Sequence, residues 1–477
     1  MAQKPIVIIG AGAAGLAAAR DLSLAGQKVI IVEARDRIGG RIFTHRDPCS
    51  PVPIELGAEF VHGKSPELWQ IAEKLAAKPY EVTERHWYFT NGKLSKSSDF
   101  WKKIESLMDE MKTSKTDRSF KEFLDSVTDD EETLRAKAMA IRYVESFHAA
   151  NIERIGVHGL IKANEASDEI DGDKSFRFLT GYDSLAQTLR VEAEACGAII
   201  HLNTVVKEIH WCTPNLKVIW ENARRENTRT ASIRRTTFTT SGVLVTLPLG
   251  VLQTSPEKFG ALRFTPELPE TKRTAINNLA VGDVVKVVMC FRDRFWEKLK
   301  LSNQDNKTVK FAELAFIHGP DAPFPTWWTQ LPVRAPILVG WVGGPKADRL
   351  MSRRDCDGES KPQTAGRSKH AAPSESDSFI LNQAVTSLMS IFNVPPDVVR
   401  DQLKASYLHD WREDPFARGA YSYVPINGLK AQEDLSQPLD NKLFFAGEAT
   451  ALGHIGTVHG AIRSGQRAAK EILSAVR

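Results

Sequence analysis

Cysteine is scarce in this sequence, with five residues among 477, scattered at positions 49, 196, 212, 290 and 356. No two of them have the spacing of a metal-ligand or redox pair, so we expect reduced thiols in a reducing compartment. The twelve histidines form no His-x-x-x-His motif and no Cys/His motif. The sequence therefore predicts no metal site.

Long apolar runs and an excess of charge of either sign are also missing. The 63 basic and 59 acidic residues leave a net charge of +4, which argues against a nucleic-acid or membrane partner. The apolar run at residues 5–19 is too short to span a bilayer. It also contains glycines at cofactor spacing, so we do not interpret it as a signal peptide. We expect a soluble, cytoplasmic protein, and the oligomeric state stays open.

The first 33 residues carry the strongest motif in the chain. Its parts are a β-branched strand, a glycine motif, an alanine-rich helix, a second strand and an acid: Pro5–Ile9, Gly10, Gly12, Ala14, Gly15, Leu16–Ala25, Val29–Val32 and Glu33. This order predicts a dinucleotide site. Glycines let the backbone approach a pyrophosphate at the helix amino terminus. The Glu33 carboxylate can accept hydrogen bonds from ribose hydroxyls.

The glycine motif alone would suit NAD as well as FAD. Residues 34–41 continue it with a second glycine doublet and Arg41. This continuation resembles the extended FAD signature of the amine-oxidase and glutathione-reductase-like flavoproteins. We therefore expect FAD, with Arg35 and Gly40 in its site and Arg41 meeting the pyrophosphate as a bidentate cation.

The carboxyl terminus predicts a second clamp for the cofactor. A short strand, Lys442–Ala446, precedes Gly447 and Glu448, and apolar residues recur at helical spacing from Thr457 to about Ala475. Thr457 is a suitable N-cap. A helix amino terminus aimed at a flavin would stabilise the negative charge of its reduced form. A terminal amphipathic helix that merely closes the fold is the alternative, and both can hold at once.

Five further segments resemble the flavin amine oxidase superfamily, closest to polyamine oxidases and the amine-oxidase domain of lysine-specific histone demethylases: residues 54–63, 244–252, 286–288 with 295–296, 411–423 and 456–461. The resemblance implies an α/β fold with a Rossmann-like FAD-binding domain of the amine-oxidase (glutathione-reductase-like) type and an interleaved α+β substrate domain. The FAD-binding domain would take 1–82, 185–280 and 410–477, and the substrate domain 83–184 and 281–409.

Composition agrees with this division and marks two insertions. Residues 108–173 are charged and helix-prone, whereas 243–247 and 284–291 are strand-like. The basic stretch 222–240 predicts a solvated hairpin. The polar stretch 352–378 predicts a mobile surface excursion without chemistry.

The family activity implied is oxidation of the carbon next to an amine nitrogen by hydride transfer to flavin N5, with dioxygen reduced to hydrogen peroxide. Lys286 interrupts an apolar run, where a buried lysine is costly unless something uses it. The resemblance implies that Lys286 holds a water against the flavin, that Trp411 packs on the flavin and that Tyr421 forms one wall of a substrate cage. Thr457 replaces a second cage tyrosine and widens the cage, which favours a polyamine-type substrate. His62 follows the flavin-facing loop.

The remaining cofactor contacts expected from the resemblance are Gly57, Ala58, Glu59, Phe60, Val206, Trp411, Gly447, Glu448, Gly456, Thr457 and Val458. No cysteine lies next to Tyr421, so we expect non-covalent FAD. There is no second glycine motif for NAD, which makes dioxygen the expected electron acceptor. The acidic run Glu165, Asp168, Glu169, Asp171 and Asp173 either receives remote cations of a polyamine or is a solvated loop.

Other functions stay open at this point. A monoamine oxidase or an L-amino-acid oxidase of the same superfamily is the main alternative, although residues 57–63 offer no arginine for a substrate carboxylate. A histone demethylase would need a coiled-coil arm, and the sequence has no long heptad pattern. A flavin-binding protein without amine oxidase activity would share the glycine-rich ends.

Overall fold

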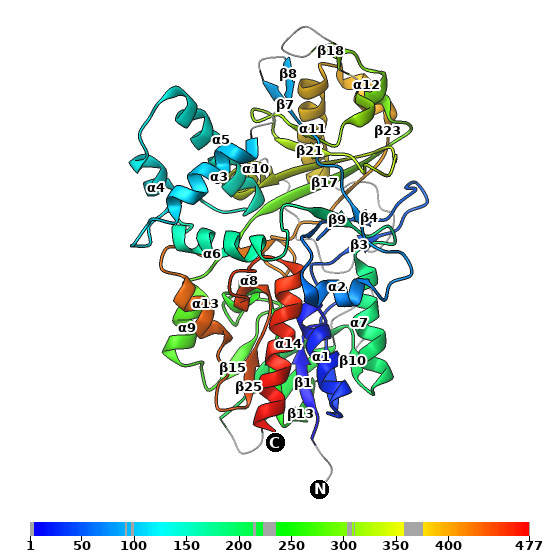
Figure 1. Ribbon diagram of the computed structural model, residues 1–477. Coiled ribbons are helices and arrows are strands. Elements are labelled where there is room, and N and C mark those ends of the chain that lie inside the picture. The colour runs from blue at the N-terminus through cyan, green and yellow to red at the C-terminus, as the bar shows by residue number, and fades with distance from the viewer. Residues whose placement is uncertain are drawn as a thin grey trace.

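The computed structural model describes residues 4–90, 93–96, 100–212, 216–222, 235–302, 308–309, 311–356 and 375–476. A five-stranded sheet with its helices forms the lower part of the molecule, and a seven-stranded sheet forms the upper part (Figure 1). Both chain ends lie together at the foot of the lower part (Figure 1).

The lower sheet is entirely parallel and has the order β10-β2-β1-β14-β25. Its strands come from three distant parts of the chain: β10 (Ile199–His201), β2 (Val29–Val32), β1 (Ile6–Ile9), β14 (Gly242–Val245) and β25 (Leu443–Phe445). Strands buried on both faces read as continuous β-branched runs, which explains why β1 and β2 were visible in the sequence.

Each face of this sheet has its own cover. Helices α1 (Ala13–Leu24), α7 (Asp183–Ala195) and α14 (Val458–Ala475) cover one face, where small alanine side chains let α1 and α14 approach closely (Figure 1). The other face packs against a four-stranded sheet of order β13-β12-β11-β15, whose strands are Arg235–Thr239, Lys217–Asn222, Thr204–His210 and Arg263–Thr265. The parallel sheet is therefore the middle one of three layers.

The upper sheet has the order β23-β17-β22-β21-β20-β7-β8. Its strands are Leu403–Leu408, Val284–Phe291, Ile337–Gly343, Thr326–Trp328, Phe316–His318, His86–Thr90 and Lys93–Lys96. One face packs on α10 (Gly344–Cys356), α11 (Glu375–Phe392) and α12 (Pro396–Gln402). Because side chains alternate along a strand, β17 sends Val285 and Val287 into that core and Lys286 to the opposite face.

Four helices flank the upper sheet: α3 (Phe100–Met111), α4 (Phe120–Ser126), α5 (Glu131–Phe147) and α6 (Val157–Asp168) (Figure 1). They confirm the helical character expected for residues 108–173. Ser119 and Glu122 form a reciprocal capping box at the start of α4. Asp130 caps α5 through a hydrogen bond from the Thr133 N–H.

The remaining described elements are short. The helices are α2 (Pro66–Ala72), α8 (Leu249–Leu252), α9 (Glu270–Asn277), α13 (Leu429–Ser436), η1 (Phe295–Lys298), η2 (Phe311–Glu313) and η3 (Glu448–Thr450). The strands are β3 (Thr44–His45), β4 (Ile54–Glu55), β5 (Val61–His62), β6 (Tyr80–Glu81), β9 (Ser175–Arg177), β16 (Ala280–Gly282), β18 (Leu301–Ser302), β19 (Thr308–Val309) and β24 (Tyr421–Tyr423).

The structure corrects the predicted start of the first helix. The sequence predicted Leu16–Ala25, whereas α1 begins at Ala13 with Gly12 as its N-cap. The last part of the glycine motif, Ala14 and Gly15, therefore already belongs to the first helical turn. Gly15 makes this possible, because a Cβ at this position would lie 2.0 Å from the Gly10 carbonyl oxygen.

The expected surface excursion at 352–378 is wrong at both of its ends. Residues 352–356 complete α10 and residues 375–378 open α11. Residues 357–374 lie outside the described part of the chain. The predicted hairpin at 222–240 is supported by the antiparallel pairing of β12 with β13, and its residues 223–234 are likewise outside the described part.

Candidate active site

A large cavity of about 1510 Å³ lies where the two sheets meet. The carboxyl ends of β1, β2, β14 and β25 open onto it through Gly10, Glu33, Thr246 and Gly447. Lys286, Phe316 and Trp328 line it from the upper sheet. Ligands in parallel α/β sheets bind at this edge of the sheet.

All but one of the residues predicted for the site line this cavity: Gly10, Gly12, Ala14, Glu33, Arg35, Gly40, Arg41, Gly57, Ala58, Glu59, Phe60, His62, Val206, Lys286, Trp411, Tyr421, Gly447, Glu448, Gly456, Thr457 and Val458. Gly15 is not among the lining residues. It lies beneath the loop, where its missing side chain lets the α1 backbone approach Gly10. Its role is therefore close packing.

The glycine loop has the shape that a pyrophosphate cradle requires. Gly10 adopts φ +106°, and a Cβ there would lie 2.8 Å from Thr246 Oγ1. At Gly12 a Cβ would meet no heavy atom within 4 Å, so the backbone faces open space. The N–H groups of the first turn of α1 have no intrahelical acceptor. The residues present therefore fit a dinucleotide phosphate.

Glu33 holds this loop in place. One carboxylate oxygen accepts a hydrogen bond from the Ala11 N–H at 2.8 Å, and the other accepts one from the Arg35 N–H at 2.9 Å. Arg35 forms an ion pair with Asp414 at 2.8 Å. The contact of Glu33 with a ribose remains a prediction. In the structure, the hydrogen bonds of this carboxylate hold the backbone of the glycine loop in position.

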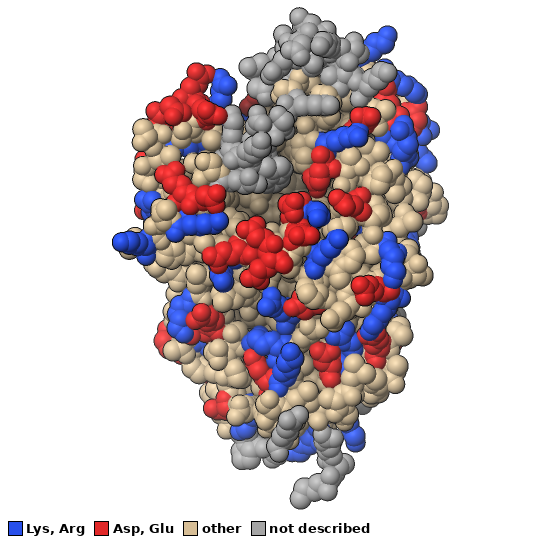
Figure 2. Space-filling view, in the orientation of Figure 1, with Lys and Arg blue, Asp and Glu red and all other residues tan. Residues whose placement is uncertain are grey.

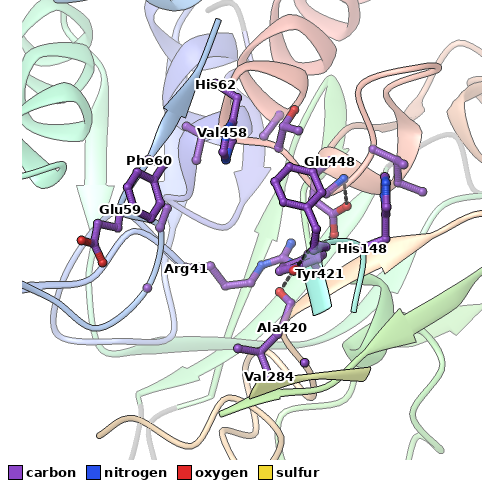
Figure 3. A pocket seen from close by; sticks show the side chains of 18 of the residues that line it. Arg41, Glu59, Phe60, His62, His148, Val284, Ala420, Tyr421, Glu448 and Val458 are labelled. Carbon is purple, nitrogen blue, oxygen red and sulfur yellow. Dashed lines mark hydrogen bonds and ion pairs between the residues drawn. The ribbon is translucent and has the colours of Figure 1, made fainter. Parts of the chain in front are cut away.

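Arg41 and Glu448 join the two cofactor motifs across the chain. One guanidinium nitrogen of Arg41 donates hydrogen bonds to the Glu448 carboxylate at 2.9 Å and to the Ala420 carbonyl at 2.8 Å (Figure 3). Glu448 also accepts hydrogen bonds from the Ser422 hydroxyl at 2.9 Å and from the Gly456 N–H at 2.8 Å. This network fixes the loop before α14. Thr457 then caps α14 by accepting a hydrogen bond from the Gly460 N–H at 3.0 Å.

Lys286 lies in a buried charge cluster that the sequence did not predict. Its Nζ is 2.6 Å from Glu59 Oε2 and donates to the Gly57 carbonyl at 3.2 Å. Glu59 Oε1 is 2.9 Å from an Arg177 nitrogen and accepts the Trp328 indole N–H at 2.9 Å. Burial alone would raise the pKa of Glu59, but the charges of Lys286 and Arg177 hold it below its usual value.

The Glu59 carboxylate points away from the side of the cavity that Tyr421 and Glu448 occupy (Figure 3). The Glu59 oxygens form ion pairs with Lys286 and Arg177 and accept a hydrogen bond from Trp328. Glu59 therefore acts on the site by fixing the position of the Lys286 ammonium. No sequence motif contains Arg177, so only the fold reveals this third member of the cluster.

Aromatic side chains form a cage next to this cluster. The Tyr421 hydroxyl donates to the Phe147 carbonyl at 2.6 Å, and the Phe147 ring lies 5.1 Å from the Tyr143 ring and 5.3 Å from the His62 ring. The Trp411 indole N–H donates to the Leu56 carbonyl at 3.0 Å. The sequence predicted Tyr421, Trp411 and His62 but not the contributions of α5.

Two histidines face the cage in their neutral form. Burial lowers the pKa of His62, and it lowers the pKa of His148 to about 4 (Figure 3). Both imidazoles are therefore uncharged near pH 7. Because none of these cage residues is an anion that could pair with an ammonium ion, burial in the cage favours the uncharged amine.

The acidic run of α6 contributes only part of its carboxylates to the cavity. Asp168 and Asp173 line it, together with Glu81, Glu84 and Asp109. Glu165 and Asp171 instead form exposed ion pairs with nearby lysines. Acidic side chains gather beside a hollow in the middle of the face that carries α6 (Figure 2).

The described residues also bear on the other sequence expectations. None of the described helices combines the length and apolar character needed to cross a membrane. Over the same residues, no group of three or more His, Cys, Asp or Glu side chains is placed to hold a metal ion. Cys49, Cys196, Cys212 and Cys290 are free.

The fold and the cavity define a dinucleotide-cradle α/β protein with an aromatic cage, and the family is shown by comparison. The chain belongs to the flavin-containing amine oxidoreductases, whose family model matches residues 13–358 and 363–473. Membership in this family implies a flavin cofactor. The sequence-based assignment to the flavin amine oxidases is therefore confirmed.

Individual relatives are more distant. The chain is 27% identical to lysine-specific histone demethylase 1 homolog 3 of Arabidopsis thaliana, with 100% of this chain and 30% of that protein covered. It is 28% identical to lysine-specific histone demethylase 1 homolog 2 of the same plant and spans 58% of the length of that protein. It is 28% identical to the probable polyamine oxidase 4 of the same plant, with 98% and 86% covered. Wild-type putrescine oxidase bound to putrescine shares the fold, with a TM-score of 0.72, 21% identity and 99% of both chains covered.

Proposed function

We propose that this protein is an FAD-dependent amine oxidase that oxidises the carbon next to an amine nitrogen in a polyamine-type substrate and reduces dioxygen to hydrogen peroxide. One observation carries the proposal. The dinucleotide cradle at Gly10–Gly12, the buried Lys286–Glu59 pair and the Tyr421 cage line the same cavity. The domain limits predicted from the sequence, the cytoplasmic location and the catalytic roles of Lys286, His62, Tyr421, Trp411 and Thr457 belong to the same proposal.

The cofactor would be held from both ends of the chain. The α1 amino terminus and Glu33 would take the pyrophosphate and ribose, and the amino terminus of α14, capped by Thr457, would meet the other end. When bound, FAD would supply the two-electron acceptor that amine oxidation requires. No described cysteine lines the cavity, which supports non-covalent binding.

The side chains of the cage act on the substrate amine. Deprotonating an aliphatic amine of pKa about 10.4 near pH 7.5 costs about 4 kcal/mol. Burial beside Tyr421, Phe147 and neutral His62 penalises the ammonium form and lowers this cost. Because both rings are neutral, His62 and His148 each have one nitrogen that can accept a proton.

An anaerobic screen of flavin bleaching tests the proposed function. Spermine, spermidine, N-acetylated polyamines, aryl amines and L-amino acids would be mixed with the purified holoenzyme. A polyamine should give a higher kcat/KM than any aryl monoamine or amino acid. If an aryl monoamine is the best substrate, the monoamine-oxidase function should replace this one; an L-amino acid would favour the amino-acid oxidase, and no bleaching at all would leave only a flavin-binding protein.

Flavin retention should depend on Glu33. Glu33→Ala removes a charged acceptor that is bonded to two loop N–H groups, a loss of about 1.5–3 kcal/mol, so most of the bound flavin should be missing after purification. The measurement is the ratio of absorbance at 450 nm to that at 280 nm. Glu73→Ala, at an exposed glutamate just after α2, is the control and should keep wild-type flavin content.

Acid precipitation should release intact FAD. The supernatant would be identified by its mass and chromatographic retention. Flavin that remains with the denatured polypeptide, or FMN in the supernatant, would contradict the assignment of non-covalent FAD.

The rate of reduction in a single turnover should rise from pH 6 to pH 9. Only the neutral amine reacts, so below the substrate pKa the rate should change by up to about tenfold per pH unit. His148 is already neutral there, because burial has lowered its pKa to about 4, and burial also lowers the pKa of His62. Burial raises the pKa of Glu55 to about 7, within the same window, so Glu55→Gln is the control and should retain the rise. A flat profile with the wild type would contradict the mechanism.

A further inference from the structure

A chain of hydrogen-bonded side chains runs along one wall of the cavity, away from the cofactor cradle and from every sequence motif. His86 Nε2 lies 2.8 Å from Glu84 Oε2, and His86 Nδ1 lies 3.0 Å from His318 Nε2. His318 Nδ1 then lies 3.3 Å from the Thr326 hydroxyl. Glu84, His86, His318 and Thr326 all line the cavity. Strands β7, β20 and β21, together with Glu84 just before β7, therefore supply one continuous series of hydrogen-bonded side chains.

Stacked rings connect this wall to the cage. The His86 ring lies 4.7 Å from the Phe316 ring at an interplanar angle of 4°, and 5.3 Å from the His318 ring at 5°. Phe316 in turn lies 6.1 Å from Phe60, which follows Glu59 in the chain. The strand register explains the stack, because β20 pairs in parallel with β7 and places Phe316 opposite His86. The wall thus leads from the Lys286 cluster to Glu84, whose side chain is 37% exposed.

The chain has a defined polarity. An ionised carboxylate only accepts, so His86 carries its proton on Nε2 and, when neutral, accepts at Nδ1. His318 must then donate from Nε2, so its Nδ1 accepts a hydrogen bond from the Thr326 hydroxyl. The Thr326 oxygen therefore remains as the acceptor at the end of the chain. Burial, followed by His86 and Arg142, lowers the pKa of His318 to about 3, so this ring is neutral. The hydrogen bonds that end on the Glu84 carboxylate polarise both imidazoles and the Thr326 hydroxyl, which strengthens the Thr326 oxygen as an acceptor.

We propose that Glu84, His86, His318 and Thr326 form a second subsite of the cavity, in which the Thr326 hydroxyl oxygen accepts a hydrogen bond from a nitrogen of the substrate remote from the one that is oxidised. This proposal rests on the proposed function and specifies its substrate class as an extended diamine or polyamine. The ring faces of Phe316 and His86 supply a flat apolar surface for the methylene chain between the two nitrogens. The positive charge of Arg142 also acts on His318, so the subsite selects an N–H donor and is not a simple cation trap.

Two sets of ligands of matched length test the subsite: α,ω-diaminoalkanes of four to twelve carbons and the corresponding n-alkylamines. Their Kd values would be measured by anaerobic calorimetry on the holoenzyme with its flavin reduced by dithionite, so that no turnover takes place. The wild type should bind its best diamine about tenfold more tightly than the monoamine of the same length, as expected for one additional hydrogen bond. Thr326→Val keeps the shape of the side chain but removes the hydroxyl oxygen, and it should abolish this preference while leaving the monoamine Kd unchanged.

The control is His210→Phe. His210 is also paired with a glutamate, Glu208, at 3.1 Å, but it does not line the cavity, so this variant should keep the preference. If Thr326→Val does not fold, Glu84→Gln removes the charge at the exposed end of the chain with little change of shape and should weaken diamine binding selectively. A wild type without diamine preference, or variants that bind both ligand sets as the wild type does or weaken both equally, would overturn the subsite. Because binding is measured without turnover, a failure of the bleaching screen would refute the oxidase and leave this result independent.

Discussion

Replacing Glu59 by alanine should lower the free energy of unfolding by about 3–5 kcal/mol, the cost of leaving a buried charge without its partner. Two cations depend on this carboxylate, since Lys286 and Arg177 lie 2.6 and 2.9 Å from its oxygens and all three side chains are only 4% exposed. Water cannot replace the lost carboxylate in such a place without opening the core. Chemical denaturation of the holoenzyme, followed by fluorescence, is the measurement.

An exposed ion pair provides the matched control. Glu131 pairs with Arg135 on the surface of α5, where its side chain is 84% exposed, and Glu131→Ala should cost less than about 1 kcal/mol. The double variant Glu59→Ala/Lys286→Met should be less destabilised than the sum of the two single variants, because it removes one of the stranded charges. A loss below 1 kcal/mol for Glu59→Ala, or strict additivity in the double variant, would show that the cluster is not coupled in this way.

Lys286→Met should retain the flavin and slow either its reduction by the amine or its reoxidation by dioxygen at least about tenfold, a barrier increase of about 1.4 kcal/mol or more. Methionine has a similar volume, so the loss is one of charge and hydrogen bonding rather than of packing. The Lys286 ammonium holds the segment that begins at Gly57, through the Gly57 carbonyl and Glu59, where the cradle meets the cage. Stopped-flow absorbance separates the two half-reactions.

A second buried lysine distinguishes chemistry from stability. Lys272 is 2% exposed and donates to the carbonyls of Asp434, Leu435 and Gln437, but it does not line the cavity. Lys272→Met should therefore lose stability while both half-reactions keep wild-type rates in the folded fraction. Rates within twofold of the wild type for Lys286→Met in both half-reactions would remove this residue from the mechanism.

The parts of the site that could be predicted are those formed by residues close together in the sequence. The cradle occupies 33 residues in which strand, glycines, helix and acid follow one another, so local spacing was enough. The carboxyl-terminal helix was visible from its apolar period and its Thr457 cap, and the structure confirms both. Lys286 could be singled out because a lysine inside a β-branched run contradicts the local pattern.

Local patterns were less reliable at the ends of elements. The first helix begins three residues earlier than predicted, since a glycine motif looks like a loop until the close contact of Gly15 with Gly10 is known. The polar stretch at 352–378 looked irregular throughout, yet its ends extend α10 and α11. Whether a polar stretch continues a helix depends on the core that the rest of that helix covers.

The sequence by itself determined the cradle, the cofactor class, the family and a set of site residues of which all but Gly15 line the cavity, because each follows from neighbours along the chain. Only the tertiary structure decided which distant side chains meet. Arg41 and Glu448 are 407 positions apart, Lys286 and Gly57 are 229 apart, and His86 and His318 are 232 apart. These contacts depend on the pairing of strands, such as β7 with β20, and on the face to which each side chain points once that register is set. A one-residue shift would turn Lys286 into the apolar core, and no property of residue 286 or its neighbours records which strand will lie beside it.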